Sequence, residues 1–276
     1  MIHNMAVRND KKPECSIITI VNKKEVFNKF KKSLSDQENV SFELIRVNND
    51  NHQYSSAREA YNEATERASG KYLIFLHPDI RFLDKFALRD ILSNVRRLKN
   101  LGVAGVAGTP ERLRNGYFVL ITNIKQGLDA HHTGEMVEEP VQVQTVDECF
   151  FVMEKEYFKK NRFSDIEGWH LYAVEQCLKA LINGKNNYVV PARLWHKSDG
   201  VSEDINYVKI GNEIVRRYGS YFPIINTTVY KWETHGIKKY YMPWMHFIDH
   251  KLVRKVRNNK LVYNSAKRIK HLFIKP

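Results

Sequence analysis

The amino-acid sequence predicts an α/β fold with a mostly parallel central sheet and flanking helices. Short runs of β-branched and aromatic residues alternate with amphipathic stretches along roughly the first 110 residues, as in a sheet with helical crossovers. The chain has 276 residues, of which 43% are hydrophobic and 12% aromatic, so it can bury a sizeable core. A strand-helix-strand rhythm in one sheet implies right-handed crossovers and parallel strands.

The first half of the chain supplies four strands and three helices. Ser56 and Glu59 are suited to cap the second helix, Gly70 stands where that helix should stop, and Asp84 can cap the third. The predicted strands cover residues 15–21, 42–48, 71–77 and 103–108, and the helices between them cover residues 23–34, 56–69 and 83–100.

After about residue 110 the pattern changes to longer, partly antiparallel strands around a polar loop. The predicted strands cover residues 117–124, 141–146 and 149–155, followed by a helix over 168–184 and a strand over 187–196. We expect an N-terminal tail over residues 1–14, one α/β domain over 15–220, and a basic helical extension over 221–276.

Positive charge is concentrated in that extension. The chain carries a formal net charge of +13, and residues 231–276 hold twelve lysines and arginines against two acids. Ile248, Leu252 and Val256 recur at helical spacing, with aromatic residues just upstream. Residues 240–276 therefore suit peripheral contact with an anionic membrane, or a helix packed on the domain with solvated bases. The nearly neutral remainder argues against nucleic acid as a partner.

Cysteine usage and the N-terminal residues bear on the compartment. Cys15, Cys149 and Cys177 are scattered without a CxxC pair, which disfavours a disulfide framework or a zinc cluster. The first residues are polar and no apolar stretch approaches about 18 residues. We expect a cytoplasmic protein, at the inner face of the membrane if the basic extension binds lipid.

Polar residues at strand ends are the candidate site residues, because ligands of parallel sheets gather at the carboxyl ends of the strands. His77 and Asp79 leave the most hydrophobic strand two residues apart, and His196 ends a later strand. Imidazole and carboxylate ligands together suit Mn²⁺ or Mg²⁺ beside a phosphate. Each residue taken alone is more typical of a turn or a satisfied polar group, and the two strand ends taken together favour a metal site and that simpler interpretation equally.

Six segments of the sequence, taken in order, resemble family 2-type nucleotide-sugar glycosyltransferases. These enzymes have the GT-A fold, which contains a Rossmann-like sheet. The resemblance rests on SIITIVN, IRVNNDN, AREAYNEATERASGKYLIFLHPDIRF, VDECFFVMEKEYF, GWHLYAVEQCLKALINGKNNYVV and LWHKSDG, over residues 15–200. It is strongest for a bacterial subgroup in which His-Pro-Asp replaces the Asp-x-Asp metal motif.

The resemblance implies a role for each matching position. His77, Asp79 and His196 would hold a divalent cation, Mn²⁺ or Mg²⁺, against the diphosphate of the donor. The implied donor-binding residues, beside the nucleotide or the sugar, are Asn22, Asp50, Arg58, Asn62 and Asp147.

The general base departs from the family pattern. Ala173 stands where the family often has the acid that deprotonates the acceptor hydroxyl, and Glu175 matches a second acid of the pattern. Glu175, Glu167 and Asp165 are therefore the candidate bases, although a plain solvent-facing helix position is the favoured interpretation of Glu175. A displaced base, a substrate-assisted route or a weakly active relative stay open. Trp169 and His170 are candidate acceptor-binding residues, because sugar rings stack on aromatic side chains.

The resemblance implies transfer of a hexose-type sugar from a nucleotide sugar, UDP-linked by expectation. The acceptor would be a hydroxyl of a glycan, a glycoprotein or a lipid-linked molecule in bacterial surface polysaccharide or glycoconjugate synthesis. Two alternatives are a nucleotidyltransferase, which the absence of glycine from residues 21–30 disfavours, and a catalytically silent nucleotide-sugar-binding or scaffold protein with the same fold.

Overall fold

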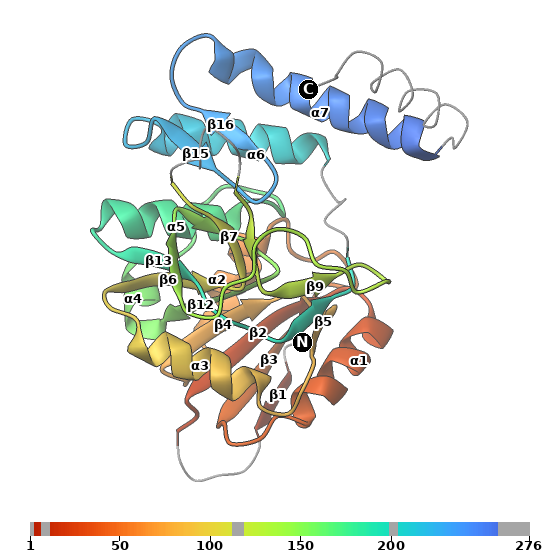
Figure 1. Ribbon diagram of the computed structural model, residues 1–276. Helices are drawn as coiled ribbons and strands as arrows, with labels where there is room; N and C mark the ends of the chain where they lie inside the picture. Colours follow the sequence, from red (N-terminus) through yellow and green to blue (C-terminus); the bar gives the residue numbers. More distant parts are fainter. Residues whose placement is uncertain (1–2, 7–11, 112–118, 199–203, 259–276) are drawn as a thin grey trace.

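The computed structural model describes residues 3–6, 12–111, 119–198 and 204–258 (Figure 1). Its central sheet has eight strands, five of which run in one direction, as the sequence predicts. In spatial order the strands are β1 (His3–Ala6), β3 (Phe42–Asn48), β2 (Cys15–Val21), β4 (Tyr72–Leu76), β12 (Phe150–Glu154), β6 (Leu101–Gly105), β13 (Asn186–Val189) and β10 (Val141–Val143). Strands β1, β12 and β10 run against the other five.

Helices cover the sheet, and shorter strands form three small sheets at its rim. The helices are α1 (Lys24–Ser35), α2 (Ala57–Thr65), α3 (Ala87–Arg97), α4 (Lys155–Lys160), α5 (Tyr172–Ile182), α6 (Ile205–Tyr218) and α7 (Lys238–Asn258). The small sheets are β11 (Thr145–Val146) with β7 (Ala107–Thr109) and β8 (Ile121–Thr122); β5 (Ile80–Phe82) with β14 (Leu194–His196) and β9 (Ile124–Gln126); and β15 (Ile224–Asn226) with β16 (Lys231–Glu233).

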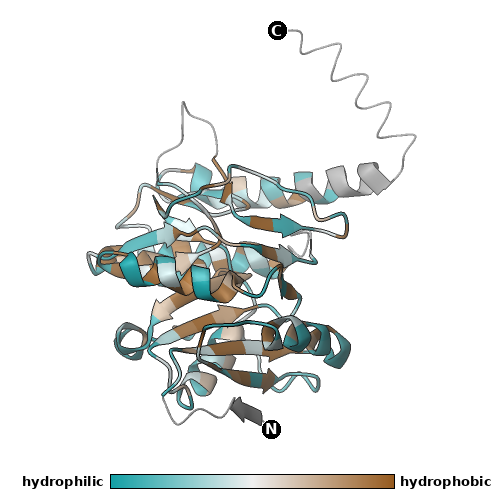
Figure 2. Ribbon diagram, turned by 60° about the horizontal axis from the view of Figure 1, so that its bottom comes forward, coloured by the Kyte–Doolittle hydropathy of each residue, from teal (hydrophilic) through white to brown (hydrophobic). Residues whose placement is uncertain are grey.

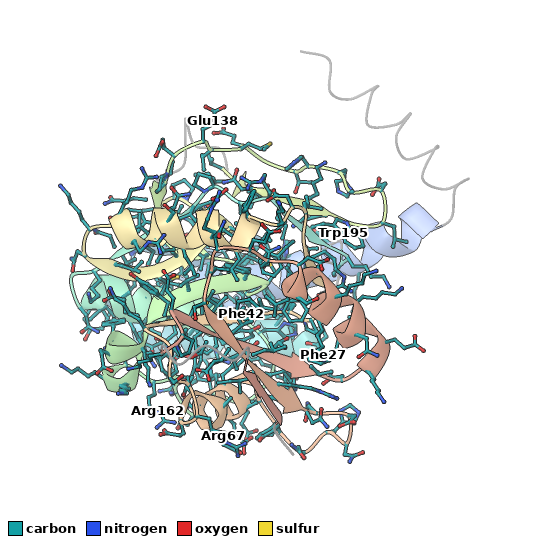
Figure 3. All side chains as sticks on the ribbon, turned by 90° about the horizontal axis from the view of Figure 1, so that it is seen from below. Phe27, Phe42, Arg67, Glu138, Arg162 and Trp195 are labelled. Atoms are coloured by element: carbon teal, nitrogen blue, oxygen red, sulfur yellow. The ribbon has the colours of Figure 1, made fainter. Side chains whose placement is uncertain are left out.

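The core lies on both faces of the central sheet, because side chains alternate along each strand. Along β4, Ile74 and Leu76 pack in the cluster under α1 and α3, whereas Leu73 and Phe75 pack under α2, α4 and α5. Figure 2 shows the hydrophobic residues concentrated on the central strands. Figure 3 shows side chains filling the space between the elements, with Arg67 and Arg162 at one edge of the molecule.

A third apolar cluster joins the C-terminal elements to the domain. Val174 and Leu178 of α5 pack against residues of α6 and of the β15–β16 hairpin, including Trp232. Gly211 of α6 makes this possible, because a Cβ built there would lie 2.1 Å from the Trp232 ring. The absence of a side chain at this position lets the indole lie directly on the helix.

Helix α7 follows the hairpin and packs on α6 and β16 (Figure 1). Phe247 is buried, whereas Ile248, the first residue of the predicted apolar stripe, is 53% exposed. At this position the stripe therefore does not pack on the domain; Leu252 and Val256 belong to α7, but the structure does not describe their side chains. Within the described residues, no helix is both long and apolar enough to cross a bilayer.

The capping signals at Ser56 and Asp84 lie just before the starts of α2 and α3, whereas Gly70 does not end α2 as expected. Ser56 caps α2 by accepting a hydrogen bond from the Glu59 backbone N–H at 3.0 Å. Asp84 lies before α3, where its carboxylate accepts from the Phe86 N–H at 2.8 Å. Helix α2 ends before Gly70, and a Cβ at Gly70 would lie 2.5 Å from the Cys15 carbonyl carbon. This glycine therefore allows close approach to β2 rather than ending the helix.

The strand predicted over residues 187–196 is divided into β13 and β14. Pro191 lies in the break, where it cannot donate a backbone hydrogen bond to a sheet. The predicted strand over 103–108 is likewise divided into β6 and β7. Residues 117–118 of a further predicted strand, and residues 259–276 of the basic extension, lie outside the described residues.

Candidate active site

Three short segments bring His77, Asp79 and His196 together. The chain leaves β4 at His77, turns through Pro78 and Asp79, and enters β5. Strand β14 pairs antiparallel with β5, with His196 opposite Ile80, and the Lys197 N–H donates to the Asp79 carbonyl at 3.3 Å. His196 therefore reaches the site through the small β5-β14-β9 sheet and not, as the sequence suggested, through the central sheet.

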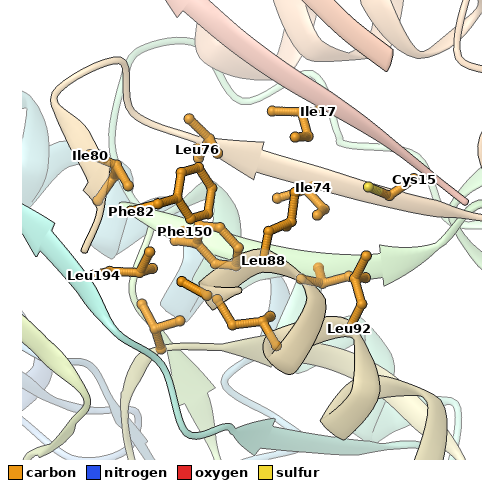
Figure 4. Packing of buried hydrophobic residues seen from close by; sticks show 14 of the residues in the cluster. Cys15, Ile17, Ile74, Leu76, Ile80, Phe82, Leu88, Leu92, Phe150 and Leu194 are labelled. Carbon is orange, nitrogen blue, oxygen red and sulfur yellow. The ribbon is translucent and has the colours of Figure 1, made fainter. Parts of the chain in front are cut away.

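Apolar anchors under this small sheet hold the two strands in register. Ile80 and Leu194 are fully buried and Phe82 is nearly so, in the same cluster as Leu76 and Phe150 of the central sheet (Figure 4). Because β5 and β14 are pinned by these side chains, the residues beside them are held without help from a ligand.

The three side chains have a geometry that fits a cation. One ligand atom from each of His77, Asp79 and His196 lies within 4.8 Å of the others. His196 Nε2 is 3.2 Å from Asp79 Oδ1, yet it is buried and makes no hydrogen bond of good geometry to any residue that the structure describes. The other ligand imidazole, His77, is held by the Tyr172 hydroxyl at 3.0 Å from its Nε2. A divalent cation accepts this mixture of nitrogen and oxygen ligands.

The local electrostatics keep the histidine neutral and the carboxylate charged. Burial and the neighbouring His196 lower the pKa of His77 to about 4. Burial opposes ionisation of Asp79, but contact with the His196 imidazole lowers its pKa to about 2. At neutral pH the site therefore offers an unprotonated imidazole and an ionised carboxylate, the forms that ligate metals.

Two cavities meet at this site. The first, which we call the N-terminal cavity, has a volume of about 510 Å³ and is lined by Asn22, Lys23, Trp169 and Lys197 among others. The second, the C-terminal cavity, has a volume of about 220 Å³ and is lined by residues that include Asp147, Tyr207 and Thr228. Four residues line both cavities: His77, Asp79, Glu148 and His170.

Two acids enter the site from the segment before β12. The His77 N–H donates to the Cys149 carbonyl at 3.0 Å, which places Asp147 and Glu148 beside the end of β4. Asp147 accepts from the Cys149 N–H at 2.9 Å and from the Thr228 hydroxyl at 2.6 Å. Although burial opposes ionisation, these hydrogen bonds lower the pKa of Asp147.

Sequence reasoning missed Glu148. Its carboxylate accepts a hydrogen bond from the Leu171 N–H at the start of α5. Burial and the neighbouring charge of Asp147 raise the pKa of Glu148 to about 8, against the lowering effect of Arg58. The segment VDECFF contained this acid, but no local pattern distinguished it from its neighbour.

Other predicted residues lie where a ligand could reach them. Asn22 is exposed after β2 and lines the N-terminal cavity, as does Trp169, which is 38% exposed. His170 lies between the two cavities, with its Nε2 3.2 Å from Asp204 Oδ1. Asp50 is exposed in the turn after β3 and is not among the residues that line either cavity.

Arg58 and Glu175 have each other as partners. Arg58 Nε donates to Glu175 Oε2 at 2.6 Å, and both side chains are completely buried. Glu175 also accepts from the Tyr218 hydroxyl at 2.9 Å. Neither residue lines the N-terminal or the C-terminal cavity, so the structure places Arg58, predicted to contact the nucleotide, and Glu175, a predicted base, in a buried ion pair.

The remaining predicted residues also lie away from the cavity walls. Asn62 hydrogen-bonds both ways with the backbone of Phe163, at 3.0 and 3.1 Å, and so braces the segment before α5. Asp165 is exposed and pairs with Arg217 at 2.6 Å. Glu167 is exposed and is not among the residues that line either cavity.

Comparison with known proteins identifies the family. Residues 16–215 match the model of a family described as "Glycosyltransferase like family". The chain belongs to this family. The nucleotidyltransferase alternative is thereby disfavoured.

Individual relatives of this glycosyltransferase-like chain are distant. A Fuscovulum blasticum protein, "ATP synthase subunits region ORF 6", is 27% identical over 168 residues, which cover 59% of this chain and 66% of that protein. S. aureus TarS residues 1–349 in complex with UDP-GlcNAc superpose with a TM-score of 0.53 at 14% identity, over 74% of this chain and 66% of that one. A longer TarS structure gives 0.51 at 15%, over 74% and 39%. These likenesses confirm the GT-A fold.

Proposed function

We propose that the protein is a metal-dependent glycosyltransferase that moves a hexose-type sugar from a UDP-linked donor to an acceptor hydroxyl. The observation that carries the proposal is the convergence of His77, Asp79 and His196 at the junction of two cavities. In this arrangement one cavity holds the donor, the other holds the acceptor, and the reacting carbon lies between them.

The N-terminal cavity suits the donor. It lies beside the carboxyl ends of β2 and β4, where ligands of parallel sheets bind. Lys23 and Lys197 supply positive charge for a diphosphate, and Trp169 and Tyr61 supply aromatic surface. Asn22 stands nearest the nucleotide in this proposal. That the neighbouring fold of TarS holds UDP-GlcNAc supports the donor class.

The three proposed metal ligands would stabilise the leaving group. His77, Asp79 and His196 would hold Mn²⁺ or Mg²⁺, which supplies positive charge against the departing nucleoside diphosphate. The fixed position of these ligands matters because charge develops on the diphosphate oxygens as the glycosidic bond breaks. Tyr172 holds the His77 ring, and the small β5-β14-β9 sheet holds His196.

The C-terminal cavity suits an acceptor hydroxyl. Its walls combine Asp147 and His170 of the domain with Tyr207 and Thr228 of the C-terminal elements. We propose a glycan, glycoprotein or lipid-linked acceptor in bacterial surface glycoconjugate synthesis.

Helix α7 supports a location at the cytoplasmic face of a membrane. Ile237, just before α7, and Tyr241, Trp244 and Ile248 within it are exposed at helical spacing, whereas Phe247 is buried. Lys238 and Lys251 are also exposed. Aromatic and aliphatic side chains next to lysines suit an anionic lipid surface. The positive charge of residues 231–276 points to the same partner.

The metal role is tested by Asp79→Ala with Asp129→Ala as the matched control, since Asp129 is an exposed aspartate 2.9 Å from His131. Purified protein is given UDP-hexoses with MnCl₂, with MgCl₂ or with EDTA, and UDP release is measured. We expect release by the wild type and the control that depends on the metal, and a loss of about 100-fold or more in Asp79→Ala. Unchanged release in Asp79→Ala would refute the metal role.

Sedimentation with vesicles tests the membrane contact. We expect binding to phosphatidylglycerol vesicles that weakens at high salt, and little binding to phosphatidylcholine vesicles. The double variant Trp244→Ser/Ile248→Ser should bind about 10-fold more weakly or worse, since it removes two apolar anchors. Leu128→Ser, which removes an exposed leucine outside the helix, is the control. Equal binding by the double variant and the control would contradict the proposal.

A silent nucleotide-sugar-binding protein is the second candidate, and Ala173 favours it by replacing the expected acid. Calorimetry with UDP-hexoses and MnCl₂ separates the two. Donor binding without UDP release, on water or on any added acceptor, would favour the silent protein.

A further inference from the structure

Helix α5 lacks an acid at the position where the family often carries its base. Ala173, the second residue of α5, is fully buried in the apolar cluster that also contains Tyr61, Phe163 and Cys177. A carboxylate at this position would enter that cluster and not a cavity. Position 173 therefore does not supply a proton acceptor in this chain.

A carboxylate from the neighbouring strand lies at the same end of α5. Glu148, two residues before β12, accepts a hydrogen bond from the Leu171 N–H at the N-cap of the helix. Leu171 adopts φ +59°, a left-handed conformation that is unusual for leucine. The strained turn thus presents its N–H to Glu148, and strain of this kind is typical of functional sites.

Glu148 is also placed between the two proposed substrates. It lines both the N-terminal and the C-terminal cavity, together with His77, Asp79 and His170. Its neighbour Asp147 is less suitable, because both of its carboxylate oxygens already accept hydrogen bonds, from Cys149 and Thr228.

We propose that Glu148 removes the proton from the acceptor hydroxyl, in place of an acid on helix α5. The inference rests on the proposed glycosyltransferase function. The acceptor O–H proton passes to the Glu148 carboxylate while the acceptor oxygen bonds to the anomeric carbon. The bond from that carbon to the β-phosphate oxygen breaks, and its electron pair leaves with the nucleoside diphosphate. Glu148 then returns the proton to water.

The groups around Glu148 set its proton affinity near neutrality. Burial and Asp147 raise its pKa, whereas Arg58 and the backbone N–H groups at the start of α5 lower it. Burial and the charge of Glu148 raise the pKa of the Tyr61 and Tyr172 hydroxyls, and the Tyr172 hydroxyl donates to the Glu148 backbone carbonyl at 3.5 Å. A base whose pKa lies close to the working pH is the most effective kind.

The test compares Glu148→Gln with the wild type. Glutamine keeps an oxygen that can accept from the Leu171 N–H, so the capping contact survives while the basic carboxylate is lost. Glu154→Gln, at the other end of β12, is the control. The assays are UDP release from UDP-GlcNAc, UDP-glucose and UDP-galactose with MnCl₂, UDP binding by calorimetry, and thermal unfolding.

We expect Glu148→Gln to release UDP about 100-fold more slowly or worse, with UDP affinity within about threefold of the wild type and no loss of thermal stability. Glu148→Asp, which keeps a carboxylate, should retain more activity than Glu148→Gln. Release by Glu148→Gln within about threefold of the wild type would overturn the proposal and leave the proposed function intact. Absence of UDP release from the wild type would instead refute the proposed function.

Discussion

The raised pKa of Glu148 predicts a pH-dependent stability that one substitution should remove. Burial and Asp147 raise this pKa from 4.5 to about 8. Between these values the folded protein binds a proton that the unfolded chain does not, so the free energy of unfolding falls as the pH rises. At about 1.4 kcal/mol per pKa unit, the full effect is at most about 5 kcal/mol.

Glu148→Gln cannot titrate, so the variant should gain stability relative to the wild type as the pH rises from 5 to 8. Urea unfolding at pH 5, 6, 7 and 8 measures the difference in the free energy of unfolding between the two proteins, which cancels the titration of all other groups. Glu138→Gln, which removes an exposed carboxyl, is the control. A difference that stays constant across this range would show that folded Glu148 is ionised throughout, and would refute the electrostatic argument.

Two further predictions concern packing and the buried ion pair. Gly211→Ala should lower the free energy of unfolding in urea by about 1–3 kcal/mol, because its Cβ would overlap the Trp232 ring; an unchanged midpoint would contradict this account of the third cluster. Arg58→Leu should cost about 3–5 kcal/mol, because it leaves the Glu175 carboxylate buried without its main partner. Arg162→Leu, which breaks an exposed ion pair with Glu66, should cost at most about 1 kcal/mol and serves as the comparison. Similar losses in the two arginine variants would argue against a special role for burial.

The sequence predicted the fold well because local patterns determine it. Alternating strands and amphipathic helices specify a parallel sheet, and the side chains of β4 face two cores as that pattern requires. The strand ending in His196 was also predicted, but its sheet was not. Pro191 divides the strand, and pairing with β5 depends on contacts across more than a hundred residues.

The site was less predictable, because its acids are distinguished only by three-dimensional surroundings. Arg58 and Glu175 looked like cavity residues, yet they pair with each other across 117 positions of sequence. Glu148 carried no signal, because its importance arises from the antiparallel insertion of β12 beside β4. Spacing along a chain does not reveal that both adjacent carboxylates, Asp147 and Glu148, enter the site, or that Glu148 alone of the two reaches both cavities.

The hairpin between α6 and α7 forms part of the C-terminal cavity although it lies outside the family match. Thr228, in the turn between β15 and β16, closes one wall of the C-terminal cavity, yet it follows the last residue of the family match. That wall is supported by its own apolar cluster, separate from the two under the central sheet. Under the proposed assignment of this cavity to the acceptor, substitutions in the hairpin would change which acceptor is used without altering the residues that line the N-terminal cavity.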